Sequence, residues 1–147
     1  MAWLATLQGK SSAFQLGDTS RRQPLNGLSG HAPVCSTGTL PSSVNLPGSR
    51  TLVTRGWLPG KFRILLPGDY IQIGYRLHLV TDGPVNSDGN GGATFGIWPS
   101  LREQPADATP VILDNPRGLF RLADNARQIS MAVTRLAAFG FKCVEAR

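Results

Sequence analysis

Only two histidines, His31 and His78, could act as bases or as imidazole metal ligands near neutral pH. His31 starts the segment His-Ala-Pro-Val-Cys, which ends at Cys35 and could bring an imidazole to a thiol. Pro33 makes that segment extended or a turn, and no signature of a cysteine enzyme surrounds Cys35. We therefore expect two structural histidines, with His78 on the polar face of a strand, and buried thiols at Cys35 and Cys143.

The loop from Asn86 to Gly91 places oxygen side chains at the first, third and fifth positions of a calcium-binding loop, with Gly at the sixth. The twelfth position, where the cation needs a bidentate Glu, is Ile97. Asp88 is the only carboxylate at the three ligand positions. A hairpin loop whose Gly and Asn residues accept positive φ is the better interpretation, and we expect no metal and no other cofactor.

Motifs of common enzyme classes do not occur in the sequence: there is no phosphate-binding glycine loop and no Gly-x-Ser-x-Gly. Its acidic residues come close in sequence only as Asp82 with Asp88 and Glu103 with Asp107, where solvation explains them. No nucleophile, base and orienting group occur together. We therefore predict that the protein is not an enzyme.

Four aromatic residues and three arginines of the central region could form a stacking surface for single-stranded nucleic acid, as on small β-barrels. They are Trp57, Tyr70, Tyr75, Trp98, Arg55, Arg63 and Arg76. We favour the interpretation in which the rings fill the core and the arginines surround it. A β-barrel module that binds single-stranded nucleic acid stays open as an alternative function.

Composition predicts that short strands and turns position these residues. The 147 residues include 17 Gly and 11 Pro and only 16% charged residues, which disfavours a coiled coil or helical bundle. We expect a mainly β fold, an antiparallel β-sandwich or barrel-like domain with long loops and at most a short N-terminal helix over 1–8. One domain would span 1–147, with a loop-rich region and edge strands over 1–50 and the β core over 51–147.

Strand-length segments rich in β-branched and aromatic residues recur along the chain. They lie at 13–16, 32–35, 51–56, 70–74, 75–80, 93–98, 111–113, 119–122 and 139–144. A turn at 67–69 precedes the central three, and a long polar loop over 81–92 separates the last two of these. Residues 122–137 fit either a helix or a strand by their spacing.

Alternation in the two central strands predicts a sheet with one apolar face. Ile71 and Ile73 alternate with polar or small residues in the first strand. In the second, Tyr75, Leu77 and Leu79 alternate with Arg76, His78 and Val80, which places the leucines on the apolar face.

Charge is distributed unevenly over the chain, whose net charge is +6. Residues 50–80 carry five basic and one acidic side chain (+4), and residues 81–115 carry one basic and five acidic (−4). Dispersed arginines without a Lys/Arg tract suit protein interfaces at least as well as nucleic acid. We expect the two regions to form opposite-sign surfaces that meet between subunits. The candidate interface residues are Arg50, Arg55, Lys61, Arg63, Arg76, Asp82, Asp88, Glu103, Asp107 and Asp114.

The first ten residues lack the basic region of a signal peptide, and no run approaches the ~18 apolar residues of a membrane span. We expect a protein that is made in the cytoplasm and has no membrane partner.

Several motifs, taken in order, resemble small tail proteins of long-tailed bacteriophages. They are Leu-Pro-Gly-Asp-Tyr-Ile-Gln-Ile-Gly at 66–74, Leu-His-Leu-Val at 77–80, Asn-Ser-Asp-Gly-Asn at 86–90, Ala-Thr-Phe-Gly-Ile-Trp-Pro-Ser-Leu-Arg at 93–102, Pro-Val-Ile-Leu at 110–113 and Leu-Phe-Arg-Leu at 119–122. The similarity covers most of residues 4–146. Each motif alone is ordinary hairpin chemistry, so the specificity lies in their order.

This resemblance implies a non-enzymatic structural protein of the virion, a distal-tail or tail-tip (baseplate) subunit that forms a homo-oligomeric ring or tube with other phage tail proteins. It implies synthesis in the host cytoplasm and residence in the virion tail, and it favours strand over helix for 128–135. Members of this group typically carry a further N-terminal β segment. Either another tail protein supplies these strands, or this chain is a reduced version of the subunit. A head decoration or head–tail connector protein is the alternative of the same structural class.

Overall fold

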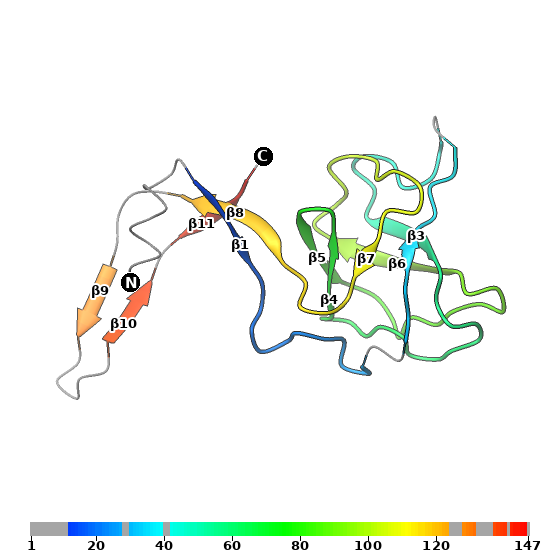
Figure 1. The fold of residues 1–147 in the computed structure, drawn as a ribbon, viewed down its shortest axis with the longest axis horizontal. Coiled ribbons are helices and arrows are strands. Elements are labelled where there is room, and N and C mark those ends of the chain that lie inside the picture. Colours follow the sequence, from blue (N-terminus) through cyan, green and yellow to red (C-terminus); the bar gives the residue numbers. More distant parts are fainter. Residues whose placement is uncertain are drawn as a thin grey trace. The chain divides into compact units, whose positions relative to one another are not determined.

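The computed structural model describes residues 12–27, 30–39, 42–123, 128–131, 137–140 and 142–146. Every regular element in these residues is a β-strand, which confirms the mainly β fold class (Figure 1). The strands are β1 (Ala13–Leu16), β2 (Val34–Cys35), β3 (Thr51–Arg55), β4 (Tyr70–Ile73), β5 (Arg76–Val80), β6 (Ala93–Trp98), β7 (Val111–Ile112), β8 (Gly118–Leu122), β9 (Gln128–Met131), β10 (Ala137–Gly140) and β11 (Cys143–Glu145). The helix expected over 1–8 lies outside the described residues.

The chain forms two compact units. The barrel unit comprises residues 17–117, and the ladder unit comprises the segments that precede and follow it. The expectation of one domain over 1–147 stays a prediction.

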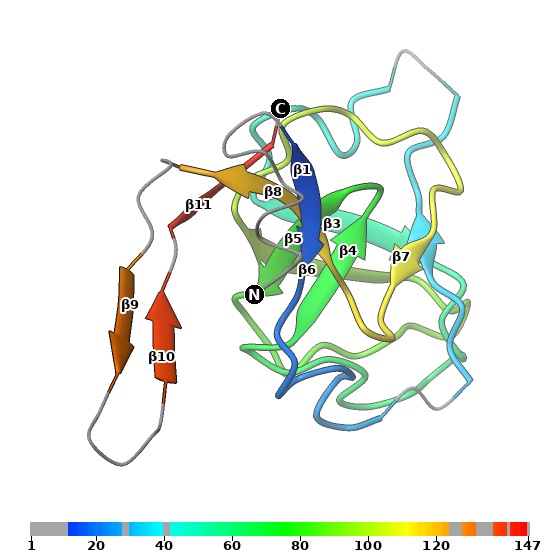
Figure 2. The ribbon, with the colours of Figure 1, turned by 60° about the vertical axis from the view of Figure 1, so that its left-hand side comes forward.

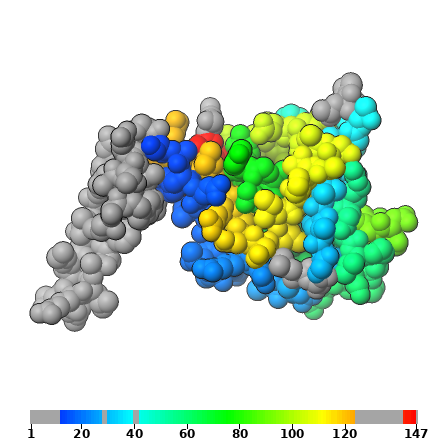
Figure 3. Space-filling view, viewed as in Figure 1, coloured from blue at the N-terminus to red at the C-terminus, as the bar shows by residue number. Residues whose placement is uncertain are grey.

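A six-stranded antiparallel sheet in the order β2-β3-β6-β5-β4-β7 curls until its two edge strands meet (Figure 2). The amide of Cys35 in β2 donates to the carbonyl of Thr109 at 2.8 Å, and the amide of Val111 in β7 donates to that of Pro33 at 2.9 Å. In the space-filling view the blue-cyan atoms around β2 lie against the yellow atoms around β7 (Figure 3). The expected barrel-like shape is thus confirmed, and its near closure protects strand edges that would otherwise be open to pairing.

The barrel interior is filled by apolar side chains that alternate along its strands, as the period of two predicts. They include Leu52, Ile71, Ile73, Val80, Phe95, Ile97 and Val111. Trp57 is also buried, and its indole N–H donates to Thr54 Oγ1 at 2.8 Å, so the ring brings no unsatisfied polar group into the core.

The prediction for the buried face of β5 is wrong. His78 is only 1% exposed and points inward with Val80, whereas Leu77 and Leu79 are half-buried on the opposite side of the strand. The imidazole is accommodated because His78 Nδ1–H donates to the carbonyl of Pro99 at 2.8 Å. The carbonyl of Pro99, just after β6, thus gives the buried imidazole a polar partner.

The turn at 67–69 is confirmed and has the geometry of a type II turn. The amide of Asp69 donates to the carbonyl of Leu66 at 3.0 Å, and Gly68 adopts φ +92 in the position that requires it. The buried Asp69 carboxylate accepts from the amides of Leu25 and Leu66. One carboxylate thus ties the loop around Leu25 to the start of the central hairpin.

Antiparallel β1, β8 and β11 form the sheet of the ladder unit, and β9 pairs with β10 in a separate hairpin. Strand rather than helix is correct for the part of 128–135 covered by β9. The single strand predicted over 139–144 is wrong: β10 ends at Gly140 and β11 begins at Cys143, because the first pairs with β9 and the second with β8.

Candidate functional site

The outer side of the barrel wall carries apolar side chains on four neighbouring strands. We call these residues the outer face: Tyr70, Leu77, Leu79, Trp98 and Ile112. Strand register brings them together, since Tyr70 and Trp98 are both opposite Leu79. Leu77 and Ile112 are both opposite Gln72 in the next row. Side chains directly opposite on one face lie close enough to contact one another, so the outer face forms one patch in which Gln72 lies between Leu77 and Ile112.

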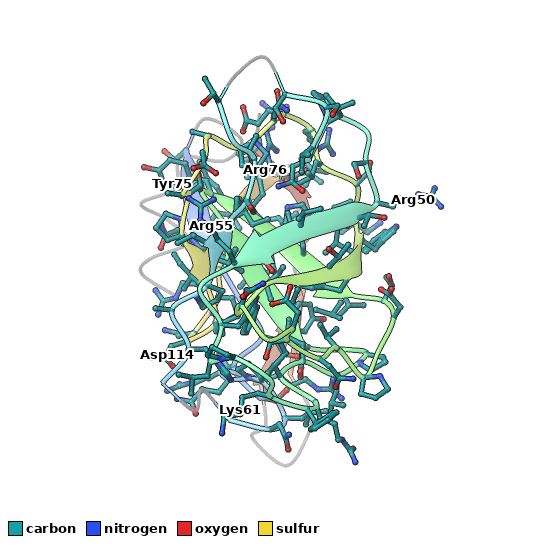
Figure 4. The ribbon with its side chains drawn as sticks, turned by 90° about the vertical axis from the view of Figure 1, so that its right-hand side faces the viewer. Arg50, Arg55, Lys61, Tyr75, Arg76 and Asp114 are labelled. Carbon is teal, nitrogen blue, oxygen red and sulfur yellow. The ribbon has the colours of Figure 1, made fainter. Side chains whose placement is uncertain are left out.

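Exposure differs across this patch. Trp98 is 63% exposed and Ile112 is 38% exposed, while Tyr70, Leu77 and Leu79 are half-buried. Tyr75, at the turn between β4 and β5, is 68% exposed beside Arg76 (Figure 4). Large exposed aromatic and aliphatic groups on a rigid sheet are typical of surfaces that bind another protein.

Gln72 is the polar member of the outer surface of β4, and both ends of its amide are engaged. Its Nε2 donates to the carbonyl of Gly74 at 2.7 Å, and its Oε1 accepts from the amide of Arg117 at 2.7 Å. Because its polar atoms are satisfied within the chain, Gln72 adds little cost to covering the neighbouring apolar groups.

Arg55 and Asp107, two of the candidate interface residues, bind each other within one chain. Arg55 Nη1 and Nη2 donate to the two carboxylate oxygens of Asp107 at 2.6 and 2.7 Å. Asp107 also accepts from the amides of Thr37 and Gly38 at 3.0 and 2.9 Å. The Arg55 hydrogen bonds, followed by those of the two amides, hold the pKa of Asp107 well below its usual value. This bidentate pair therefore fastens β3 to the loop before β7.

Arg76 and Glu103 also approach each other within one chain, with Arg76 Nε 3.5 Å from Glu103 Oε1. The side chain of Glu103 is 77% exposed. A single long contact of this kind contributes little to stability in water.

Asp82 and Asp88 serve the loop between β5 and β6. Asp82 accepts from the amide of Gly96, and Asp88 accepts from the amides of Asn90 and Gly92 at 2.7 and 2.8 Å. These amide bonds lower the pKa of Asp88. The loop joins antiparallel β5 and β6, as expected of a hairpin, and the Asp88 carboxylate organises its turn.

The loop between β5 and β6 requires glycine at position 91. Gly91 adopts φ +78, and a Cβ there would collide with the backbone oxygen of Trp57. No group of three or more His, Cys, Asp or Glu side chains that could hold a metal ion gathers in the described part of the chain.

Of the remaining candidate residues, Lys61 and Arg63 lie in one segment, whereas Arg50 and Asp114 lie in other parts of the barrel unit. Arg50 extends into solvent just before β3, and Lys61 and Arg63 are exposed in the segment that follows this strand (Figure 4). Asp114 follows β7, and its Oδ1 accepts from Gln23 Nε2 at 3.2 Å. Among the described residues, no carboxylate forms an ion pair with Arg50, Lys61 or Arg63.

The structure separates the residues of the alternative nucleic-acid surface. Trp57 is in the core, whereas Tyr75 and Trp98 are exposed. The expectation that the aromatic rings fill the core is thus confirmed for Trp57 and wrong for Tyr75 and Trp98.

His31 and Cys35 form no hydrogen bond with each other. His31 Nδ1 accepts from the amide of Leu58 at 3.1 Å. Cys35 is buried, whereas Cys143 is half-buried, so the expectation of two buried thiols is confirmed only for Cys35. Burial, with a smaller contribution from Asp107, raises the pKa of the Cys35 thiol to about 11.

The outer face is the feature that the sequence analysis missed. Two adjacent apolar residues in one strand indicate that both of its faces are apolar, because successive side chains point to opposite sides. Leu79 with Val80 in β5, and Ile97 with Trp98 in β6, are such pairs. No protein-family model, no curated protein and no solved structure matches this chain. No helix that could span a membrane occurs in the described residues.

Proposed function

We propose that this chain is a structural subunit of a bacteriophage tail, of the distal-tail or tail-tip type, without catalytic activity. It assembles into a ring or tube with copies of itself and with other tail proteins, and it resides in the virion. The ordered motifs over 66–122 resemble that group, and the barrel supplies the kind of rigid scaffold that such a subunit needs.

The outer face is the observation that carries this proposal. Stable protein interfaces are centred on aromatic and aliphatic groups that become fully desolvated on binding, and Trp and Tyr are enriched among their strongest contributors. Trp98 and Ile112 expose such groups on strands whose backbones are fixed by barrel pairing. Binding through strands costs little conformational entropy compared with binding through loops. We assign the outer face to contact with a second copy of this chain.

Fewer charged residues are free to guide this contact than the ten that the charge pattern predicts. Arg55 is neutralised by Asp107 within the chain, so it offers little to a neighbour. Arg50 extends into solvent, where it could meet an acidic group, such as the exposed Asp114, of the next copy (Figure 4). Such rim charges affect association rate and register more than affinity.

The test measures assembly of the purified full chain by sedimentation velocity over a concentration series. We expect wild-type oligomers, and we expect Trp98→Glu and Ile112→Glu each to weaken self-association by about 30-fold or more, as removal of an interface centre does. The matched control is Leu46→Glu, because Leu46 is 45% exposed but lies outside the outer face. Circular dichroism should show that all three variants keep the β fold.

Two results would overturn the proposal. One is a wild-type chain that stays monomeric both alone and with phage tail proteins. The other is a Leu46→Glu variant that loses assembly as strongly as Trp98→Glu. Tight binding to single-stranded oligonucleotides that falls steeply with salt would instead favour the nucleic-acid alternative.

A further inference from the structure

A small basic pocket lies in the barrel unit and shares no residue with the outer face. Its volume is about 180 Å³, and it is lined by Asn26, Gly27, His31, Leu58, Lys61, Phe62, Arg63 and Ile64. Pockets for drug-sized molecules are larger, roughly 300 Å³ or more. This one has room for a single small group.

Lys61 and Arg63 place two positive charges at the pocket, and neither forms an ion pair with a carboxylate of the described residues. Asp107 and Glu103 of the barrel unit bind Arg55 and Arg76 and not these two cations. The pocket therefore holds an uncompensated charge of two, which favours a ligand of opposite charge.

His31 adds a neutral hydrogen-bond donor to the lining of the pocket. Its Nδ1 accepts from the amide of Leu58, so in the neutral ring the proton is on Nε2. Burial, followed by the charge of Lys61, lowers the pKa of His31, which keeps the ring neutral at pH 7. The ring is also held edge-on to Trp57 with centroids 5.1 Å apart, which fixes its orientation.

Arg63 is held in place by the backbone. It adopts φ +55, an uncommon conformation for a residue with a side chain. Its amide donates to Asn86 Oδ1 at 2.8 Å, and its carbonyl accepts from Asn26 Nδ2 at 2.9 Å. Such a conformation persists only where the surroundings maintain it. The backbone from which the Arg63 side chain extends is therefore held in position.

Phe62 gives the pocket an apolar margin. It lies between the two cationic residues and is 80% exposed, although a phenyl ring gains by burial. Leu58 lines the same pocket and is 38% exposed. A ligand that carried its charge on a ring or apolar body would cover these groups.

We propose that this pocket binds a phosphomonoester: a phosphate dianion, contacted by Lys61, Arg63 and His31, on a small apolar or aromatic body that covers Phe62. Two uncompensated cations match the charge of about −1.5 to −2 on a phosphomonoester at pH 7 better than that of a carboxylate. The fork of Arg63 suits phosphate oxygens, and Lys61 supplies a point charge.

Phenyl phosphate is the probe, and inorganic phosphate and benzoate are its comparison arms. Each is titrated into the full chain at low salt, and amide shifts are followed by two-dimensional NMR. We expect saturable shifts around His31 and Leu58 at about 10 mM phenyl phosphate or less, binding several-fold weaker for inorganic phosphate and about tenfold weaker for benzoate. Equal binding of inorganic and phenyl phosphate would remove the apolar body from the proposal, and equal binding of benzoate would overturn the preference for a dianion.

Variants separate the pocket from general attraction of anions to a basic protein. Lys61→Gln and Arg63→Gln should each weaken phenyl phosphate binding by about tenfold. Arg50→Gln removes the same charge outside the pocket and should leave the affinity within about twofold. No shift at the pocket, or an equal loss in Arg50→Gln, would overturn the proposal whether or not the protein assembles.

Discussion

The barrel unit and the ladder unit differ in how much apolar side chain they bury. The barrel encloses one continuous core that extends in sequence from Cys35 to Leu113. In the described side chains of β1, β8 and β11, Leu122 is the one large apolar residue that is buried. Backbone pairing alone is marginal for a small sheet in water. The barrel is therefore the better-packed scaffold, and the described sheet of β1, β8 and β11 gains less from buried side chains.

The largest effect should come from removing core volume on each side of this comparison. Phe95→Ala in the barrel should reduce the free energy of unfolding by about 3–5 kcal/mol, because Phe95 is 2% exposed and contacts Trp57 edge-on. Leu122→Ala should cost about 2 kcal/mol, the low end for such a change, because Leu122 is buried but does not belong to the barrel core cluster. Urea unfolding followed by circular dichroism and tryptophan fluorescence measures both.

The number of unfolding transitions shows whether the two units unfold independently. Two independent units predict that Leu122→Ala shifts an early transition and leaves the barrel transition in place. If both variants shift one shared transition, the chain unfolds as a unit, which supports the expectation of one domain over 1–147.

Much of the barrel could be predicted from the sequence because its signals are local. Alternating β-branched residues and the Pro67-Gly68-Asp69 turn determine the β4–β5 hairpin, and its strands occur within a residue of the expected bounds. The face of β5 could not be predicted, because Leu79 and Val80 are both apolar. The carbonyl that accepts from His78 Nδ1 belongs to Pro99, which is 21 residues away.

The charge pattern shows the same limit for the candidate site. The net charges of residues 50–80 and 81–115 identify two regions of opposite sign. They do not show which charged residues form ion pairs with each other inside one chain. Arg55 and Asp107 are 52 residues apart, and closure of β2 onto β7 brings them together. The pocket around Lys61 and Arg63 is equally non-local, since Asn26 and His31 come from the loop-rich region. Pairing between distant segments is a property of topology rather than of local composition.

The two cysteines provide a second way to compare the units, since Cys35 lies in the barrel and Cys143 in β11. Only the thiolate reacts with disulfide reagents. Because its pKa is near 11, on the order of one Cys35 side chain in a thousand is ionised at pH 8. Burial also keeps the reagent away from this thiol. Cys143 is half-buried. We expect one fast and one very slow thiol in a reaction with an aromatic disulfide, with Cys143→Ser abolishing the fast phase. Equal rates for the two thiols would contradict the difference in packing.

The smallest expected effect concerns the Arg55–Asp107 pair that fastens the closure of the barrel. Because the folded pKa of Asp107 lies below the unfolded value of about 3.9, its contribution to stability is present above that pH and declines as the pH falls toward the folded pKa. Both side chains are partly exposed, so the contribution is reduced by solvent. Asp107→Asn should therefore lower the midpoint of thermal unfolding by a few degrees at pH 7 and progressively less below about pH 4. Glu103→Gln is the matched control, since it removes an exposed carboxylate with one long contact, and its midpoint should follow the wild type at every pH. A difference between Asp107→Asn and wild type that stays constant down to pH 2 would show that the carboxylate is not what closes the barrel.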